Sequence, residues 1–280
     1  MEGRSTRAAL TVWSVLVVAF LWVPLVLIMV YAFNASNVES WPISGFTTHW
    51  FHAAWTAEIR TSLWLSVRVG LTASAIALVL GTMAAFGVAR FHFFGREAIS
   101  FLFVLPIALP GIVTGIALNS AFVAGNVNLS TWTIVIGHAT FCVVLVYNNV
   151  LARLRRSSPS LIEASQDLGA DGWQTFHFVV WPVLSTALVA GGLLAFALSF
   201  DEVIVTTFTA GAQNTIPLLI LGYIRLGQQL PVVNVIAFAM IVLTAIPVLI
   251  AQRLMRDTGV IRRGAAKVTE AVETAQITAY

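Results

Sequence analysis

The sequence is poor in the residues on which most enzymes and soluble domains depend. Only 10% of its 280 residues are charged, whereas 59% are hydrophobic. Its one lysine, Lys267, does not belong to a G-x-x-x-x-G-K-S/T loop, so no lysine can reach the phosphates of a nucleotide. The single cysteine, Cys142, excludes an internal disulfide, and the five histidines lack the spacing of metal ligands. We therefore expect a membrane protein that is not an enzyme by itself, has no cofactor and does not hydrolyse ATP.

Uncharged intervals long enough to cross a bilayer recur along the chain. A spanning helix needs about 20 mostly apolar residues. Six such spans are expected: at about Ala8–Phe33, at about Thr61–Ala89, on each side of the polar break Gly125–Ser130 between Glu97 and Arg153, between Asp171 and Asp201, and between Arg225 and Arg253. The predicted fold class is an all-α membrane protein with six transmembrane helices.

The basic residues indicate how these spans are oriented. They are spread thinly along the chain, which offers no surface to a nucleic-acid partner. Cytoplasmic loops are enriched in Lys and Arg, and six spans with the N-terminus inside leave twelve of the 15 basic residues inside. A seventh span at Val203–Ile224 leaves only seven inside and eight outside. We therefore predict that both termini are cytoplasmic and that Val203–Ile224 extends the fifth span and adds a short outer segment.

The first 60 residues admit alternative interpretations. Arg4 and Arg7 before an apolar stretch also fit a secretory signal, but the stretch is about twice the ~7–15 residues of a signal core, which favours a permanent helix. The aromatic-rich outer loop Asn34–Arg60 is expected to anchor at the headgroup level rather than to bind a ligand. The predicted organisation is residues 1–60 for this helix and loop, residues 61–256 for a five-helix core, and residues 257–280 for a cytoplasmic tail.

The inner loop between spans four and five, residues 153–178, has internal order. Ser157–Ser160 interrupts the preceding helix, and a short helix is predicted at Leu161–Leu168. Gly169 is expected to end that helix in the left-handed conformation. A second helix, starting at Asp171 or Gly172, is predicted to enter the membrane at Trp181–Pro182.

This loop carries a family motif. The motif begins with Glu163-Ala164-Ser165. Gly169 lies six residues after Glu163, and Pro182 lies thirteen residues after Gly169. The spacing resembles the E-A-A…G…I-x-L-P loop of the membrane subunits of binding-protein-dependent ABC importers, with Ser165 and Trp181 replacing the usual Ala and Leu. The resemblance covers nearly the whole chain. It implies a type I, MetI-like permease fold in the bacterial inner membrane.

The resemblance also implies partners and roles. The loop is expected to dock into a groove on a separate ATPase, with a bend at Gly169 and a docking face that includes Ala164, Ser165 and Leu168. Glu163 is expected to contact the partner, although the alternative is that it only stabilises its helix dipole, by about 0.3–1 kcal/mol. The implied partners are two ATPase subunits, a homologous second permease, an external solute-binding protein and the lipid bilayer.

Four further stretches resemble one branch of this family, the second permease of spermidine/putrescine importers. They are Ala197–Val203, Ile216–Leu218, Tyr223–Gly227 and Pro231–Ala237. The branch implies that the solute is a polyamine or a similar organic cation. The chain departs from it after Pro110, where Gly111–Gly115 replaces an acidic residue that polyamine permeases often carry. Another small organic solute therefore stays open.

Asp201 and Glu202 are the candidate residues of the translocation path. Apart from Glu58 they are the only acidic residues in or at the edge of a span, where ionisable groups usually face a cavity or a partner. Two carboxylates suit a cation that has lost its hydration, and Tyr223 adds a cation–π face of about 0.5–2 kcal/mol. The alternative is structural: the pair marks the end of span five or binds Arg225 or Arg68.

Two other classes of function receive less support. A secondary transporter usually shows inverted repeats, and the sequence has no convincing repeat. A membrane-anchored scaffold or receptor needs a sizeable soluble domain, for which the polar segments are too short.

Within the third span, Pro106, Pro110, Gly111 and Gly115 are expected to loosen a helix beside the path.

Overall fold

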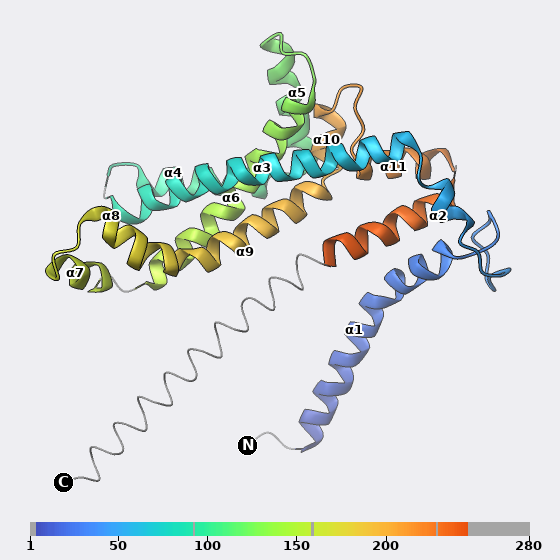
Figure 1. Cartoon of the computed structure of the whole chain (residues 1–280), viewed down its shortest axis with the longest axis horizontal. Coiled ribbons are helices and arrows are strands. Elements are labelled where there is room, and N and C mark those ends of the chain that lie inside the picture. The colour runs from blue at the N-terminus through green and yellow to red at the C-terminus, as the bar shows by residue number, and fades with distance from the viewer. Residues whose placement is uncertain (1–3, 92, 158–159, 228, 246–280) are drawn as a thin grey trace. The chain divides into compact units, whose positions relative to one another are not determined.

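The computed structural model describes residues 4–91, 93–157, 160–227 and 229–245 (Figure 1). Within these ranges the chain forms helices and one isolated antiparallel bridge between Asn34 and Phe46, which confirms the predicted all-α class. The described residues fall into two compact units. The first comprises residues 4–64 and 214–243, and the second comprises residues 65–213 and 244–245.

The helices differ in length and in how far they are buried. They are α1 (Arg4–Ala32), α2 (His49–Ala53), α3 (Ala57–Arg90), α4 (Arg96–Ala108), α5 (Gly111–Ala124), α6 (Thr131–Arg156), α7 (Ser160–Asp167), α8 (Gly172–Thr175), a π-helical turn (Phe176–Val180), α9 (Trp181–Phe200), α10 (Ile204–Thr209), α11 (Ile216–Leu226) and a last helix, Leu230–Ala245. Four candidate spans, Ala9–Ala32, Ala57–Arg90, Thr131–Arg156 and Gly172–Phe200, are long and apolar enough to cross a membrane. They coincide with the expected spans one, two, four and five. The end of the expected sixth span and the tail lie outside the described residues.

The core of the second unit is built around α6. Of its most apolar window 72% is buried, against 6% for α1. Its buried side chains, Tyr147 among them, pack with Ala77 and Ala85 of α3 and with Leu184 and Ala195 of α9. A helix that is apolar on most of its surface is a helix surrounded by others. This central position makes α6 the frame on which the second unit's functional segments are held.

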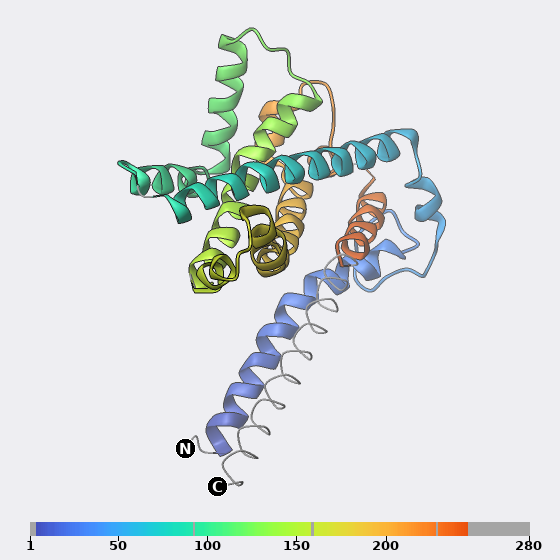
Figure 2. The same ribbon diagram turned by 60° about the vertical axis from the view of Figure 1, so that its left-hand side comes forward.

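The expected third span is broken in the middle. Leu109 and Pro110 adopt extended backbone angles between α4 and α5, because the proline ring disfavours helix in the residue before it. Helix α5 turns away from the direction shared by α3 and α4, as the two views show (Figures 1 and 2). The predicted loosening is therefore located at Pro110, whereas Pro106 stays inside α4.

Helix α5 is held instead by α10. Asn119 Nδ2 donates a hydrogen bond of 2.7 Å to the Phe208 carbonyl. A Cβ atom on Gly115 would lie 2.5 Å from the Phe208 ring, so only glycine permits this approach. The contact joins residues about 90 positions apart and explains why α5 does not continue the line of α4.

The prediction that the fifth span continues into Val203–Ile224 is wrong, whereas the short outer segment expected there stays a prediction. Helix α9 ends at Phe200, and two short helices, α10 and α11, follow it. The Glu202 carboxylate accepts a 2.9 Å hydrogen bond from the Val205 backbone, which starts α10 anew. Gly211, at φ +63°, then lies in the turn that follows α10.

In the first unit, the loop after α1 folds around one asparagine. The Asn34 side-chain amide donates to the Val38 carbonyl, and the Asn34 backbone carbonyl accepts a 2.8 Å hydrogen bond from the Trp50 indole. Phe33, Phe51 and Phe238 form an aromatic cluster with ring centroids 5.0 to 6.1 Å apart. The loop thus has a fixed conformation with exposed tryptophans at its surface, among them Trp41 and Trp55.

Candidate functional site

The predicted turn between the two short loop helices is formed by hydrogen bonds that close α7. Gly169 has φ +83°, the left-handed conformation expected for it. The Ala170 amide donates to the Ser165 carbonyl (3.0 Å) and the Gly169 amide donates to the Gln166 carbonyl (2.9 Å), which is the Schellman pattern. Asp171 and Gln174 then cap α8 by exchanging hydrogen bonds of 2.7 and 3.0 Å. The end of one helix at Gly169 and the start of the next at Gly172 are confirmed.

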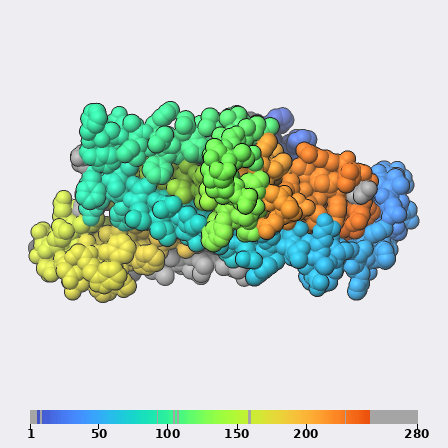
Figure 3. Space-filling view, turned by 90° about the horizontal axis from the view of Figure 1, so that it is seen from above, coloured from blue at the N-terminus to red at the C-terminus, as the bar shows by residue number. Residues whose placement is uncertain are grey.

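The five predicted coupling residues divide into exposed and structural ones. Glu163, Ala164 and Gly169 are exposed, and 89% of Leu168 is accessible. Ser165 is half-buried: its hydroxyl donates to the Ile162 carbonyl at 2.8 Å and lies 3.0 Å from the Thr175 hydroxyl. Ser165 therefore ties α7 to α8, and the other four are available to a partner. The loop forms the yellow surface at one end of the second unit (Figure 3).

The loop is joined firmly to the long helices. The π-helical turn continues directly into α9, and the Phe176 ring lies 6.5 Å from the Phe86 ring of α3. Arg153 Nε at the end of α6 donates a 2.9 Å hydrogen bond to the Val183 carbonyl of α9. π-helical turns are frequent at functional positions. The end of the loop is thus continuous with α9 and in contact with α3, and the Arg153 bond joins α6 to α9.

The two candidate path carboxylates have different surroundings. Asp201 caps the C-terminal end of α9, and its side chain has no bonding partner among the described residues. The Asp201 side chain is exposed, and the desolvation that its neighbours cause raises the pKa of its carboxyl. The Glu202 carboxylate is already engaged by the Val205 amide of α10. Of the two carboxylates, only that of Glu202 is engaged by a hydrogen bond among the described residues.

The third candidate, Tyr223, belongs to the first unit and lies next to Glu58. Its hydroxyl donates a hydrogen bond of 3.1 Å to Glu58 Oε2. Both residues line a cavity of about 340 Å³ together with Asn214 and Arg225. The structure thus brings Tyr223 to a carboxylate that sequence reasoning had noted only in passing.

Sequence reasoning missed a histidine at the corner where α9 turns into α10. His138 of α6 is 1% exposed, and its two ring nitrogens lie 2.7 Å from Ser199 Oγ and 2.8 Å from Thr206 Oγ1. The available signal was a lone ionisable residue inside an apolar span, a position that is costly and usually functional. We call the segment Ser199–Thr206 the corner.

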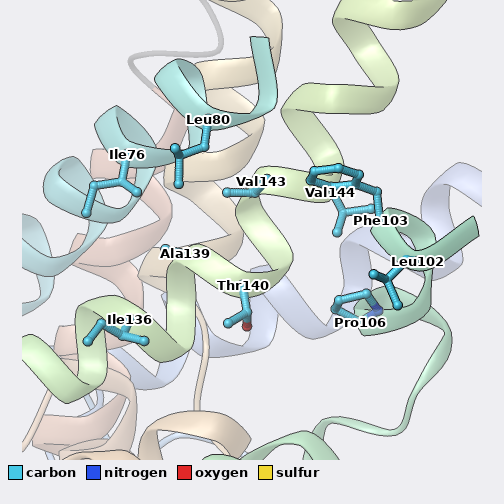
Figure 4. Close-up of a pocket in the computed structure, with 10 residues that line it drawn as sticks. All are labelled: Ile76, Leu80, Leu102, Phe103, Pro106, Ile136, Ala139, Thr140, Val143 and Val144. Atoms are coloured by element: carbon cyan, nitrogen blue, oxygen red, sulfur yellow. The ribbon is translucent and has the colours of Figure 1, made fainter. Parts of the chain in front are cut away.

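A groove of about 500 Å³ in the second unit is apolar (Figure 4). Its lining from α3, α4 and α6 includes Leu80, Phe103 and Val143. Thr140 is the only lining residue with a hydroxyl group, and that group is bonded to the Gly137 carbonyl at 2.6 Å. A groove without a carboxylate suits lipid or other apolar surface, and it does not compensate a cation.

The arrangement of helices is that of ABC importer permeases. A solved bacterial ABC transporter involved in the import of the acidic polysaccharide alginate superposes with a TM-score of 0.64 at 18% identity, covering 92% of this chain and 98% of that one. Residues 77–259 match the family described as binding-protein-dependent transport system inner membrane component. The chain belongs to this family and is a multi-pass inner-membrane permease subunit.

Two curated relatives cover most of the chain. The putrescine transport system permease protein PotI of Escherichia coli (strain K12) is 32% identical over 228 residues, which are 78% of this chain and 80% of that protein. The spermidine/putrescine transport system permease protein PotC of the same organism is 29% identical over 260 residues, 92% of this chain and 96% of that protein. The resemblance inferred from the loop and from the four further stretches is confirmed.

Proposed function

We propose that this permease forms the path for putrescine, spermidine or a similar organic cation in an ATP-driven importer. The observation that carries the proposal is the Asp201 carboxylate, which lies at the end of α9, exposed within this chain and without a partner among the described residues. A carboxylate in such a place is costly unless a cation meets it. The transport activities named for the relatives PotI and PotC agree with a cationic solute.

The proposed topology has six spans with both termini in the cytoplasm. Helices α4 and α5 together form the third span, and the sixth span lies between Arg225 and Arg253, of which the structure describes the helix Leu230–Ala245. Residues 1–60 contribute the first span and outer loop, residues 61–256 the permease core, and residues 257–280 a cytoplasmic tail. The distribution of Lys and Arg supports this orientation.

Coupling is proposed to run through the inner loop, residues 153–178. The exposed Glu163, Ala164, Leu168 and Gly169 contact a separate ATPase subunit, and Ser165 keeps α7 and α8 in one rigid piece. The complete importer then contains two ATPase subunits, this chain with a homologous second permease, and an external solute-binding protein. The chain itself carries no ATPase site.

A second candidate is the same importer class with another small organic solute. The stretch Gly111–Gly115 carries no acidic residue. At the start of α5 the chain therefore offers a cation nothing beyond backbone carbonyls and Thr114. This candidate shares the topology and coupling of the first.

Uptake into proteoliposomes tests the solute. The full complex is reconstituted with its ATPase, partner permease and binding protein. It should accumulate labelled putrescine or spermidine when ATP is supplied on the side of the membrane where the ATPase subunits lie. An Asp201→Asn, Glu202→Gln double variant should lose most of that uptake. Full uptake by the double variant, or wild-type preference for a neutral or anionic compound, contradicts the proposed solute.

A further inference from the structure

His138 joins three helices of the second unit through both nitrogens of its ring. The ring belongs to α6, Ser199 to α9 and Thr206 to α10. All three side chains are at least 97% buried, so water does not replace a lost partner. A buried ring with two hydrogen bonds to two other helices fixes the positions of all three elements relative to one another.

The hydroxyl groups determine which nitrogen carries the proton. Thr206 has a single hydroxyl hydrogen, which it donates to the Glu202 carbonyl at 2.7 Å. Thr206 Oγ1 must therefore accept from His138, so the proton is on Nε2. Nδ1 is then the acceptor, and the Ser199 hydroxyl donates to it. This tautomer is assigned from the hydrogen-bond donors. It gives a partner to the Ser199 and Thr206 hydroxyl groups and to both ring nitrogens of His138.

The result is a directional chain of hydrogen bonds across the corner. It runs from the Ser199 hydroxyl to His138 Nδ1, from His138 Nε2–H to the Thr206 oxygen, and from the Thr206 hydroxyl to the Glu202 carbonyl. The last acceptor belongs to a candidate path residue and is adjacent to Asp201. Helix α10 cannot move away from α9 unless this chain breaks.

The backbone next to His138 is shaped for the same contact. A Cβ atom on Gly137 would lie 3.1 Å from Val205 and 3.3 Å from Thr209, both on α10. Glycine therefore lets α10 approach α6 closely enough for the ring to reach Thr206. The small size of Gly137 and the ring of His138, both in α6, thus hold α10 in the same position.

We propose that His138 is a positioning residue of the translocation path. Its neutral ring holds the corner, and with it Asp201, in the geometry that meets the solute; the role deepens the proposed function and rests on it. His138 does not contact the solute. The series of hydrogen bonds needs a donor toward Thr206 and an acceptor toward Ser199 at position 138. An apolar side chain of similar size lacks both.

Transport kinetics separate positioning from mere stability. With labelled putrescine as the probe, His138→Leu should raise KM about tenfold, which corresponds to about 1.4 kcal/mol, while normal amounts of complex are assembled. Thr206→Val should give a similar rise, and the double variant should be no worse than the larger single effect. His138→Gln, whose amide nitrogen can replace Nε2–H, should restore most of the affinity.

Cys142→Ala is the matched control. Cys142 is also buried in α6, but its Sγ–H donates to the Ala195 carbonyl of α9 at 3.3 Å and, among the described residues, contributes no hydrogen bond to α10. This variant should keep the wild-type KM. Additive effects of His138→Leu and Thr206→Val, or a KM unchanged in both, would overturn the proposal.

Hydrogen exchange gives a readout that does not depend on the solute. In the purified full complex, His138→Leu should increase exchange of the α10 amides, residues 204–209, about tenfold while the amides of α6 residues 143–150 stay protected. Unchanged protection of α10 refutes the positioning role whatever the importer transports. If α10 loosens as expected but the wild-type complex takes up neither putrescine nor spermidine, the corner is positioned by His138 and the proposed solute is wrong.

Discussion

At the scale of single residues, the two corner carboxylates are chemically equal but structurally different. The Glu202 carboxylate accepts the Val205 amide and so behaves as part of the helix start of α10. The Asp201 carboxylate has no such bond among the described residues, and its side chain is exposed. The sequence presented Asp201 and Glu202 as one pair. The structure divides them into a supporting residue and a candidate solute ligand.

This division predicts unequal effects of neutralisation. Asp201→Asn should raise KM for putrescine about tenfold without changing the amount of complex, since one charged contact is typically worth about 1.5–3 kcal/mol. Glu202→Gln should mainly lower the thermal stability of the complex, because it weakens the start of α10. Uptake kinetics and thermal unfolding of both variants measure these effects.

Glu97→Gln, at the exposed start of α4, is the control and should change neither quantity. If Asp201 instead formed a structural pair with Arg68 or Arg225, Asp201→Asn would reduce the assembled complex. A companion Arg→Gln change would then partly restore it. That pattern contradicts the assignment of Asp201 to the solute.

Two helical glycines predict opposite responses to the same substitution. Gly115→Ala places a Cβ 2.5 Å from the Phe208 ring and should destabilise the permease by about 1–3 kcal/mol through overpacking. Gly87→Ala in α3 meets nothing within 4 Å and should stabilise it by about 0.5–1 kcal/mol. Thermal unfolding of the two purified variants compares them directly. Equal midpoints would show that α5 does not pack on α10.

At the scale of elements, the conformation of the loop of α7 and α8 depends on short-range interactions that can be predicted from the sequence. A glycine with a positive φ, a capping box at Asp171 and a serine that bonds across the two helices are all short-range devices. They work without long-range contacts. This is why the helix boundaries of the loop were predicted to within one or two residues.

The same devices predict how the loop fails. Gly169→Pro cannot adopt φ +83° and should abolish solute-stimulated ATP hydrolysis and uptake, with the protein still inserted in the membrane. Glu163→Arg should do the same by reversing the charge at the exposed docking face. ATPase and uptake assays on membranes with matched subunit levels check both.

Gly172→Ala supplies the control for the backbone change. Gly172 starts α8 with ordinary angles and with open space around its Cα, so alanine should be tolerated. Wild-type transport by both Gly169→Pro and Glu163→Arg would remove the coupling role from this loop.

At the scale of the whole molecule, long-range contacts limit what the sequence can predict. The long helices α1, α3, α6 and α9 follow from apolar length alone, and each was predicted. The separate helices α10 and α11 were not, because their apolar residues look the same as a continuation of α9. Their position depends on partners distant in sequence, such as Asn119 with Phe208 and His138 with Thr206. The stretch Ala197–Val203 was therefore matched to a branch of the family, but the geometry of the corner was not predicted.

The orientation of the chain gives the last prediction. Twelve basic residues on one side and three on the other favour six spans with a cytoplasmic tail. A cysteine introduced at Thr269, which lies outside the described residues, in a Cys142→Ala background should resist an impermeant thiol reagent added to intact cells. It should react once the cells are permeabilised. A second single cysteine at Ser40, in the loop after α1, should label in intact cells and so control for reagent access. If Thr269→Cys is labelled from outside while Ser40→Cys is protected, the orientation is reversed; labelling of both from outside requires an odd number of spans and restores a seventh crossing at Val203–Ile224.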